Sequence, residues 1–210
     1  MSTLQPLGLF DHLTHKANLK HTRYGWLRLT PAYSVHLVSE ILDTLPDKHP
    51  IVLDPFCGTG TTALVCAEKG IPCDTTDINP FLLWLTRTKT RTYTQAEVEC
   101  FEQCACRVAE ALCTNASKPS WLPSLHQIEK WWDMDTLQSL SLAFQMIIAL
   151  EGQVSEAVAD LLKIAFCRLM IERANVSFGH QSMSFKASEN RSEEHTSELQ
   201  SLTNLVCRLL

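Results

Sequence analysis

The stretch from residue 51 to residue 60, Ile-Val-Leu-Asp-Pro-Phe-Cys-Gly-Thr-Gly, constrains the fold more than any other part of the chain. Its apolar beginning predicts a buried strand, the glycines at 58 and 60 predict a tight turn, and residues 61–69 continue in a helical pattern. Glycine suits such a turn because the missing Cβ lets the backbone bend sharply and lets a ligand approach. A strand, a glycine turn and a helix start together predict a site for a nucleoside-containing molecule.

Residues 70–77 follow this helix and are interpreted as a second strand that ends in an acid, Asp77. In a strand–helix–strand unit this acid lies beside the first turn, where its carboxylate can accept hydrogen bonds from both ribose hydroxyls. Ile78 comes next, and Asn79 followed by Pro80 predicts the start of another helix. The fold class expected is therefore α/β, with parallel strands joined by helices.

Asp54, at the end of the first strand, narrows the choice of ligand. A loop that cradles a nucleoside triphosphate needs a lysine after its last glycine, whereas Gly60 is followed by Thr61 and Thr62. A site for a pyrophosphate is disfavoured because the Asp54 carboxylate would repel the phosphates. The acid suits a cationic ligand, such as the ammonium and sulfonium groups of S-adenosylmethionine (AdoMet).

Three segments resemble motifs of the amino-group DNA methyltransferases, which modify adenine N6 or cytosine N4. Residues 54–62, Asp-Pro-Phe-Cys-Gly-Thr-Gly-Thr-Thr, resemble their AdoMet-binding motif, and residues 77–80, Asp-Ile-Asn-Pro, resemble their ribose-binding motif. Residues 29–38 resemble the segment that lines the methionine end of their pocket. The resemblance implies cofactor-binding roles for Thr30, Pro31, Asp54, Phe56, Gly58, Gly60, Thr61, Asp77, Ile78 and Asn79.

The resemblance covers residues 25–185 and implies how the chain is organised. Lys130-Trp-Trp132 and Arg173-Ala-Asn-Val-Ser-Phe178 are similar to segments of members that carry a helical insertion. The fold implied is part of a Rossmann-like class I methyltransferase sheet with a large helical insertion. The expected divisions are an arm and AdoMet-binding half at residues 1–93, the insertion at 94–176, the start of a further part at 177–190, and a tail at 191–210.

The tail does not read as native protein. Residues 191–201, Arg-Ser-Glu-Glu-His-Thr-Ser-Glu-Leu-Gln-Ser, match one reading frame of a common short-read sequencing adapter residue for residue. A polar surface helix is the alternative interpretation of the same residues. We expect the adapter, which places the loss of the natural reading frame near Asn190 and makes the chain a C-terminally truncated fragment.

The motif that does the chemistry in this family is absent from the sequence. The resemblance implies a catalytic Asp/Asn/Ser-Pro-Pro-Tyr/Phe loop, which binds the target amino group and stacks on the flipped base. None of the nine prolines of the chain is adjacent to another. We therefore expect a site-specific methyltransferase by family that is inactive as this chain, with no catalytic residues assigned.

Composition and the remaining motifs limit the classes of function that the chain can have. The chain is 45% hydrophobic, with no apolar run long enough to span a bilayer and no secretory signal, which predicts a cytoplasmic protein. Its nine cysteines lack paired metal-ligand spacing, so no metal is expected. The net charge of −5 does not indicate nucleic-acid binding, although the basic residues of 15–28 and 86–92 could contact phosphates or form a solvated surface.

The function expected is AdoMet-dependent methyl transfer to an exocyclic amino group of a DNA base, as in restriction-modification systems. Two alternatives stay open. An RNA base N-methyltransferase can share the Asp54–Gly60 motif but would need an RNA-binding domain upstream of it. A non-catalytic module that binds AdoMet or a nucleotide would lack a Pro-Pro-aromatic motif in the full reading frame.

Overall fold

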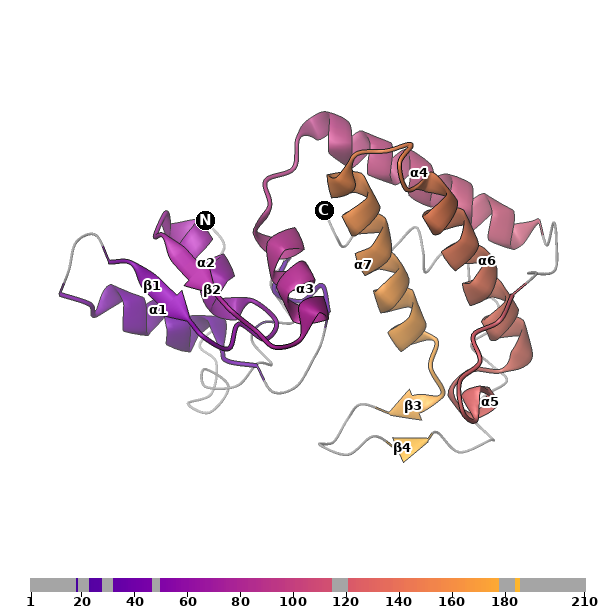
Figure 1. Cartoon of the computed structure of the whole chain (residues 1–210), viewed down its shortest axis with the longest axis horizontal. Coiled ribbons are helices and arrows are strands. Elements are labelled where there is room, and N and C mark those ends of the chain that lie inside the picture. Colours follow the sequence, from indigo (N-terminus) through magenta and orange to yellow (C-terminus); the bar gives the residue numbers. More distant parts are fainter. Residues whose placement is uncertain are drawn as a thin grey trace, which may run out of the picture. The chain divides into compact units, whose positions relative to one another are not determined.

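The computed structural model describes residues 18, 23–27, 32–46, 50–114, 121–177 and 184–185. The chain divides into two compact units, Met1–Thr92 and Tyr93–Leu210 (Figure 1). Thr30 and Pro31, the segment from 186 to 190 and the tail at 191–210 lie outside the described residues. Each unit is described by itself below.

The first unit is a strand–helix–strand arrangement with flanking helices. Strands β1 (Val52–Asp54) and β2 (Cys73–Thr75) pair in parallel, with Val52 opposite Cys73 and Asp54 opposite Thr75. The helices of this unit are α1 (Val35–Asp43), α2 (Thr61–Lys69) and α3 (Pro80–Thr90). Helix α2 connects the two strands and packs against both of them, as well as against α1 and α3 (Figure 1).

Local signals set the ends of these elements. Ser34 caps α1 by accepting from the His36 N–H, and Asn79 caps α3 by accepting from the Phe81 N–H, with Pro80 at the first helical position. Left-handed glycines bound α2 at both ends, Gly60 with φ +80° and Gly70 with φ +67°. Apolar side chains from α1, α2 and residue 24 form the core of the unit: Tyr24, Val35, Val38, Leu64 and Val65, with Leu42 packed against them.

The second unit is predominantly helical. Its helices are α4 (Gln95–Cys113), α5 (Ile128–Trp131), α6 (Met134–Leu150) and α7 (Glu156–Glu172), and its strands β3 (Val176–Ser177) and β4 (Ser184–Phe185) pair antiparallel. Helices α4, α6 and α7 pack against one another pairwise (Figure 1). Their shared core is apolar and includes Phe101, Val108, Leu137, Ala143, Leu161, Leu162 and Ile164.

The structure confirms the coarse fold class, because helices and a small parallel sheet occur together, although helix predominates. The Rossmann-like class I sheet and the four divisions of the chain stay predictions. The second strand ends at Thr75 and not at the acid, so Asp77 lies in the loop that follows. Within the described ranges, no helix is long and apolar enough to cross a membrane.

Candidate functional site

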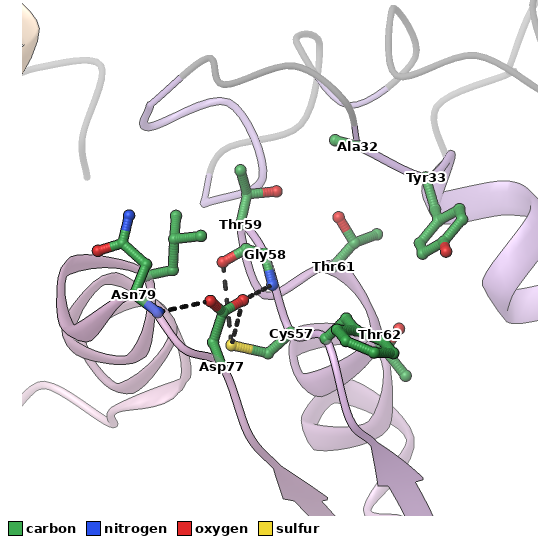
Figure 2. A pocket seen from close by; sticks show the side chains of 11 residues that line it. Ala32, Tyr33, Cys57, Gly58, Thr59, Thr61, Thr62, Asp77 and Asn79 are labelled. Carbon is green, nitrogen blue, oxygen red and sulfur yellow. Dashed lines mark hydrogen bonds between the residues drawn. The ribbon is translucent and has the colours of Figure 1, made fainter.

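An open cavity of about 590 Å³ lies in the first unit, where the segments that follow β1 and β2 meet the starts of α2 and α3 (Figure 2). Its walls come from four short segments of the chain. They are formed by Ala32, Tyr33, Phe56, Cys57, Gly58, Thr59, Thr61, Thr62, Asp77, Asn79 and Leu82. A volume of this size is typical of a pocket for a small organic ligand.

The glycine turn forms one wall of the cavity. The Gly60 N–H donates to the Cys57 carbonyl at 2.7 Å, which closes a four-residue turn. Gly58 and Gly60 have φ values of +49° and +80°, a region that glycine enters without a steric cost. A Cβ on Gly60 would lie 2.7 Å from Thr86 Oγ1, so the second glycine is also required by its close approach to α3.

The Asp77 carboxylate lies beside this turn and is bonded to it (Figure 2). One oxygen accepts from the Gly58 N–H at 3.0 Å, and the other accepts from the Asn79 N–H at 2.9 Å. These bonds, that from Asn79 foremost, lower the pKa of Asp77 below its ordinary value, so the group is a carboxylate at neutral pH. The oxygen bonded to Gly58 also accepts from the Cys57 thiol in a long, weak contact at 3.9 Å, which a ligand hydroxyl could displace.

The start of α2 lies at the cavity wall. Thr61 is the first residue of this helix, and both Thr61 and Thr62 line the cavity. The first N–H groups of a helix have no partner within it and carry partial positive charge. This wall is therefore suited to an anionic group, whereas Asp77 supplies negative charge beside Gly58.

The structure brings together five of the ten residues that the sequence predicts for the site. Phe56, Gly58, Thr61, Asp77 and Asn79 all line the cavity. The Phe56 ring is 80% exposed, which leaves its face open to a ligand.

Three of the predicted residues lie elsewhere. Gly60 is buried behind the wall. The Asp54 side chain accepts from the Phe56 N–H at 3.1 Å and is not part of the lining. Ile78 is fully exposed at 101% and is likewise not part of the lining. The remaining two, Thr30 and Pro31, fall outside the described residues.

Six lining residues were not assigned by the sequence: Ala32, Tyr33, Cys57, Thr59, Thr62 and Leu82. Ala32 and Tyr33 fall in the segment whose resemblance placed it at the pocket, so a signal for them existed. With no histidine or cation evident beside it in the sequence, Cys57 is predicted to be a small filler of the turn and not a nucleophile. It is buried, burial raises the pKa of its thiol, and Thr86 Oγ1 lies 3.5 Å from its sulfur, all of which fit that interpretation. Nothing in the sequence distinguishes Leu82 as a cavity residue from the other apolar residues of α3.

Comparison with known proteins finds a match over the segment that contains the glycine turn and Asp77. The model of the D12 class N6 adenine-specific DNA methyltransferase family matches residues 35–111, a range that includes the glycine turn, Asp77 and α3. The resemblance seen in the sequence motifs is thus confirmed over residues 35–111, where the chain is similar to this family.

Two relatives are similar to the chain over comparable lengths. The Type II methyltransferase M.AvaI of Nostoc sp. strain PCC 7120 is 32% identical over 69 residues, which cover 32% of this chain and 14% of that protein. The Type II methyltransferase M.MjaII of Methanocaldococcus jannaschii is 33% identical over 84 residues, which cover 40% of this chain and 16% of that protein. The chain thus spans about a sixth or less of the length of these methyltransferases. No solved structure matches it.

Proposed function

We propose that this chain is the AdoMet-binding part of a DNA methyltransferase that acts on an exocyclic amino group of a base. The observation that carries the proposal is the pairing of the Asp77 carboxylate with the glycine turn at one cavity, inside the segment that matches the methyltransferase family. The family named by that match acts on adenine N6, which favours adenine over cytosine as the target.

The residues of the cavity fit AdoMet group by group. The ribose diol offers two donors to the Asp77 carboxylate, which besides its two backbone N–H bonds accepts a weak contact from the Cys57 thiol at 3.9 Å. The methionine carboxylate suits the positive N-terminus of α2 at Thr61. The exposed Phe56 and Tyr33 rings at the rim offer faces for the adenine base and for the cationic sulfonium.

In this proposal the described residues bind and orient, and the chemistry lies elsewhere. AdoMet supplies a methyl group that its sulfonium already activates for transfer. Asp77 and the turn at Cys57–Gly60 fix the ribose and the adenosine end, and the class I sheet would hold them in register with the target base. No Pro-Pro-aromatic loop occurs in the sequence, so the groups that would hold the flipped base and its amino group are not assigned to this chain.

Calorimetric titration of the full chain tests the proposal. We expect saturable binding of AdoMet and of S-adenosylhomocysteine with one site per chain, and no binding of NAD⁺ or ATP at the same concentrations. Preference for NAD⁺ or ATP would indicate a pyrophosphate site and would overturn the assignment, as would failure to bind any of the four. The base is tested separately, by mapping N6-methyladenine and N4-methylcytosine in DNA from cells that carry the full reading frame.

A further inference from the structure

Lys89 is a buried cation on α3, and no acid among the described residues forms an ion pair with it. Its side chain is 1% exposed, which makes it one of the most completely buried large side chains of the described residues. Its ammonium donates to the Thr59 carbonyl at 3.0 Å and to the Tyr24 carbonyl at 3.4 Å. This placement corrects the sequence interpretation of residues 86–92 for Lys89 alone, because a lysine buried to this degree cannot contact a phosphate.

One of its two acceptors belongs to the wall of the cavity. The Thr59 carbonyl is part of the peptide that leads into Gly60, and the N–H of that same peptide closes the turn onto Cys57 at 2.7 Å. Both polar groups of one peptide are thus bonded, the carbonyl to Lys89 and the N–H to Cys57. A rotation of this peptide would break both bonds at once, and Thr59 would no longer line the cavity in its present position.

A buried ammonium holds its acceptors tightly, because a buried charge without hydrogen bonds is costly. A filler role would need no charge at this place, and an apolar side chain of equal length would fill the same space without a desolvation penalty. The hydrogen bond from the Lys89 ammonium to the Thr59 carbonyl in the cavity turn therefore indicates a role beyond packing.

We propose that Lys89 is a positioning residue that fixes the Cys57–Gly60 turn in the conformation that binds AdoMet. The proposal deepens the function proposed above and rests on it for the identity of the ligand. Lys89 does not line the cavity, so it acts through the Thr59 carbonyl and not by contact with the ligand. Its removal should loosen the turn and weaken cofactor binding while the rest of the unit stays folded.

The decisive variant is Lys89→Met, which keeps an unbranched side chain about as long as the alkyl stem of lysine and removes the ammonium. The matched control is Lys69→Met, which removes a lysine of the same unit from an ion pair with Asp43 at the surface. Lys89→Arg keeps a charge and donors at the site, and tests for rescue. Three properties are measured in the full chain: AdoMet affinity by calorimetry, thermal melting, and hydrogen exchange without ligand in peptides that cover residues 56–64.

We expect Lys89→Met to bind AdoMet at least tenfold more weakly, to melt no lower than the parent, and to exchange faster only in the 56–64 peptides. Lys69→Met should keep the parent affinity within twofold, and Lys89→Arg should lie between the two. Unchanged exchange in the 56–64 peptides of Lys89→Met would overturn the proposal. A uniform rise in exchange over the first unit, or loss of cooperative melting, would also overturn it, because Lys89 would then be a general structural residue.

The exchange readout needs no ligand. If the parent chain fails to bind AdoMet, the proposed function fails, whereas the exchange of the turn in Lys89→Met still decides whether Lys89 orders it.

Discussion

Asp77 joins two pieces of backbone that belong to different elements. Its two oxygens accept from the turn after β1 and from the residue that caps α3. The same carboxylate therefore holds the turn and the start of α3 together before any ligand arrives. Both bonds come from backbone N–H groups, so an asparagine could keep one of them but not the negative charge.

We expect Asp77→Ala to weaken AdoMet binding by about 30-fold or more, because two hydrogen bonds to a charged acceptor are lost along with the attachment of the turn. Asp77→Asn should fall between the parent and Asp77→Ala. Calorimetry of the full chain measures both. Equal affinities of the parent and Asp77→Ala would remove the ribose role from this residue.

Gly60 is the glycine whose substitution has a steric cost that the structure locates. We expect Gly60→Ala to lower the free energy of unfolding by about 2–4 kcal/mol, from the left-handed backbone and from overpacking against Thr86. Gly70→Ala is the matched control, because its φ is also positive and nothing lies within 4 Å of an added Cβ. It should cost only about 1 kcal/mol. Urea denaturation followed by circular dichroism compares the two, and similar losses would contradict the steric explanation.

Lys89 should leave a signature in the pH dependence of stability. Burial lowers the pKa of Lys89 from 10.5 to about 8, so between these values the unfolded chain binds the proton that the folded chain has released. Stability should therefore rise with pH across this window, by up to about 1.4 kcal/mol per pH unit, and the burial penalty should be fully present below pH 8.

Other groups oppose this trend, since burial foremost raises the pKa of the Cys73 thiol from 9.0 to about 12, which costs stability as the pH rises above 9. The difference between the parent and Lys89→Met isolates the lysine, because the cysteines are common to both. Urea denaturation at several pH values should show this difference shift in favour of the parent as the pH rises from 8 to 10.5. A difference that stays flat over that range would show that Lys89 keeps its proton.

At the scale of the elements, one side chain connects the starts of two helices. Glu97 completes a capping box with Thr94 at the start of α4, where one carboxylate oxygen accepts from the Thr94 N–H at 2.9 Å. Its other oxygen accepts from the hydroxyl of Ser155 at 3.3 Å, and Ser155 caps α7. The first turns of α4 and α7 are thus tied through a single carboxylate.

We expect Glu97→Ala to lower the free energy of unfolding of the helical unit by about 1–2 kcal/mol, since it removes the capping box and the bond to Ser155. Glu99→Ala is the control on the same helix, because Glu99 accepts, within the described ranges, an exposed bond from Gln95 one turn away. That change should cost a few tenths of a kcal/mol. Urea denaturation that found no difference between the two variants would contradict the shared cap.

The sequence predicts helix starts well and tertiary burial poorly, for a physical reason. Caps are local, so Asn79 with Pro80 and Thr94 with Glu97 predict the starts of two helices, and the structure confirms both. The sequence predicts a further helix that starts at Asp133 or Asp135, and in the structure Asp133 is its cap. It predicts the last helix from Gln153, but Ser155 caps that helix, which begins at Glu156. The four-residue helix α5 carries no cap that a pattern could reveal.

The candidate site shows the same contrast between residues in local motifs, which the sequence identifies, and residues buried by tertiary packing, which it does not. Gly58, Thr61, Asp77 and Asn79 belong to contiguous motifs and line the cavity as the sequence predicts. Lys89 is easily grouped with Arg87 and Arg91 as one basic stretch, but helical spacing places it on the side of α3 opposite to both. Its burial comes from the packing of α3 beneath the glycine turn, which joins residues 30 positions apart.

At the scale of the molecule, the chain is a small part of proteins like its relatives, of which it spans 14% and 16%. We expect no methyl transfer to DNA from the full chain, because it contains no Pro-Pro pair and so no loop of the kind that holds the flipped base. A tritiated-AdoMet assay on mixed-sequence DNA measures this, with Gly60→Asp as the control. Label above the background of that variant would place the catalytic groups within this chain.

The outer face of β1 remains open to solvent. Ile51 and Leu53, which alternation places on one side of the strand, are 78% and 67% exposed, and among the described residues β1 pairs only with β2. An apolar strip beside an open strand edge is a template on which a second copy can add its own strand. Such pairing would make the measured affinity for AdoMet depend on the protein concentration. Titrations at two dilutions would separate ligand uptake from self-association, and a charged residue in place of Leu53 would keep the chains apart.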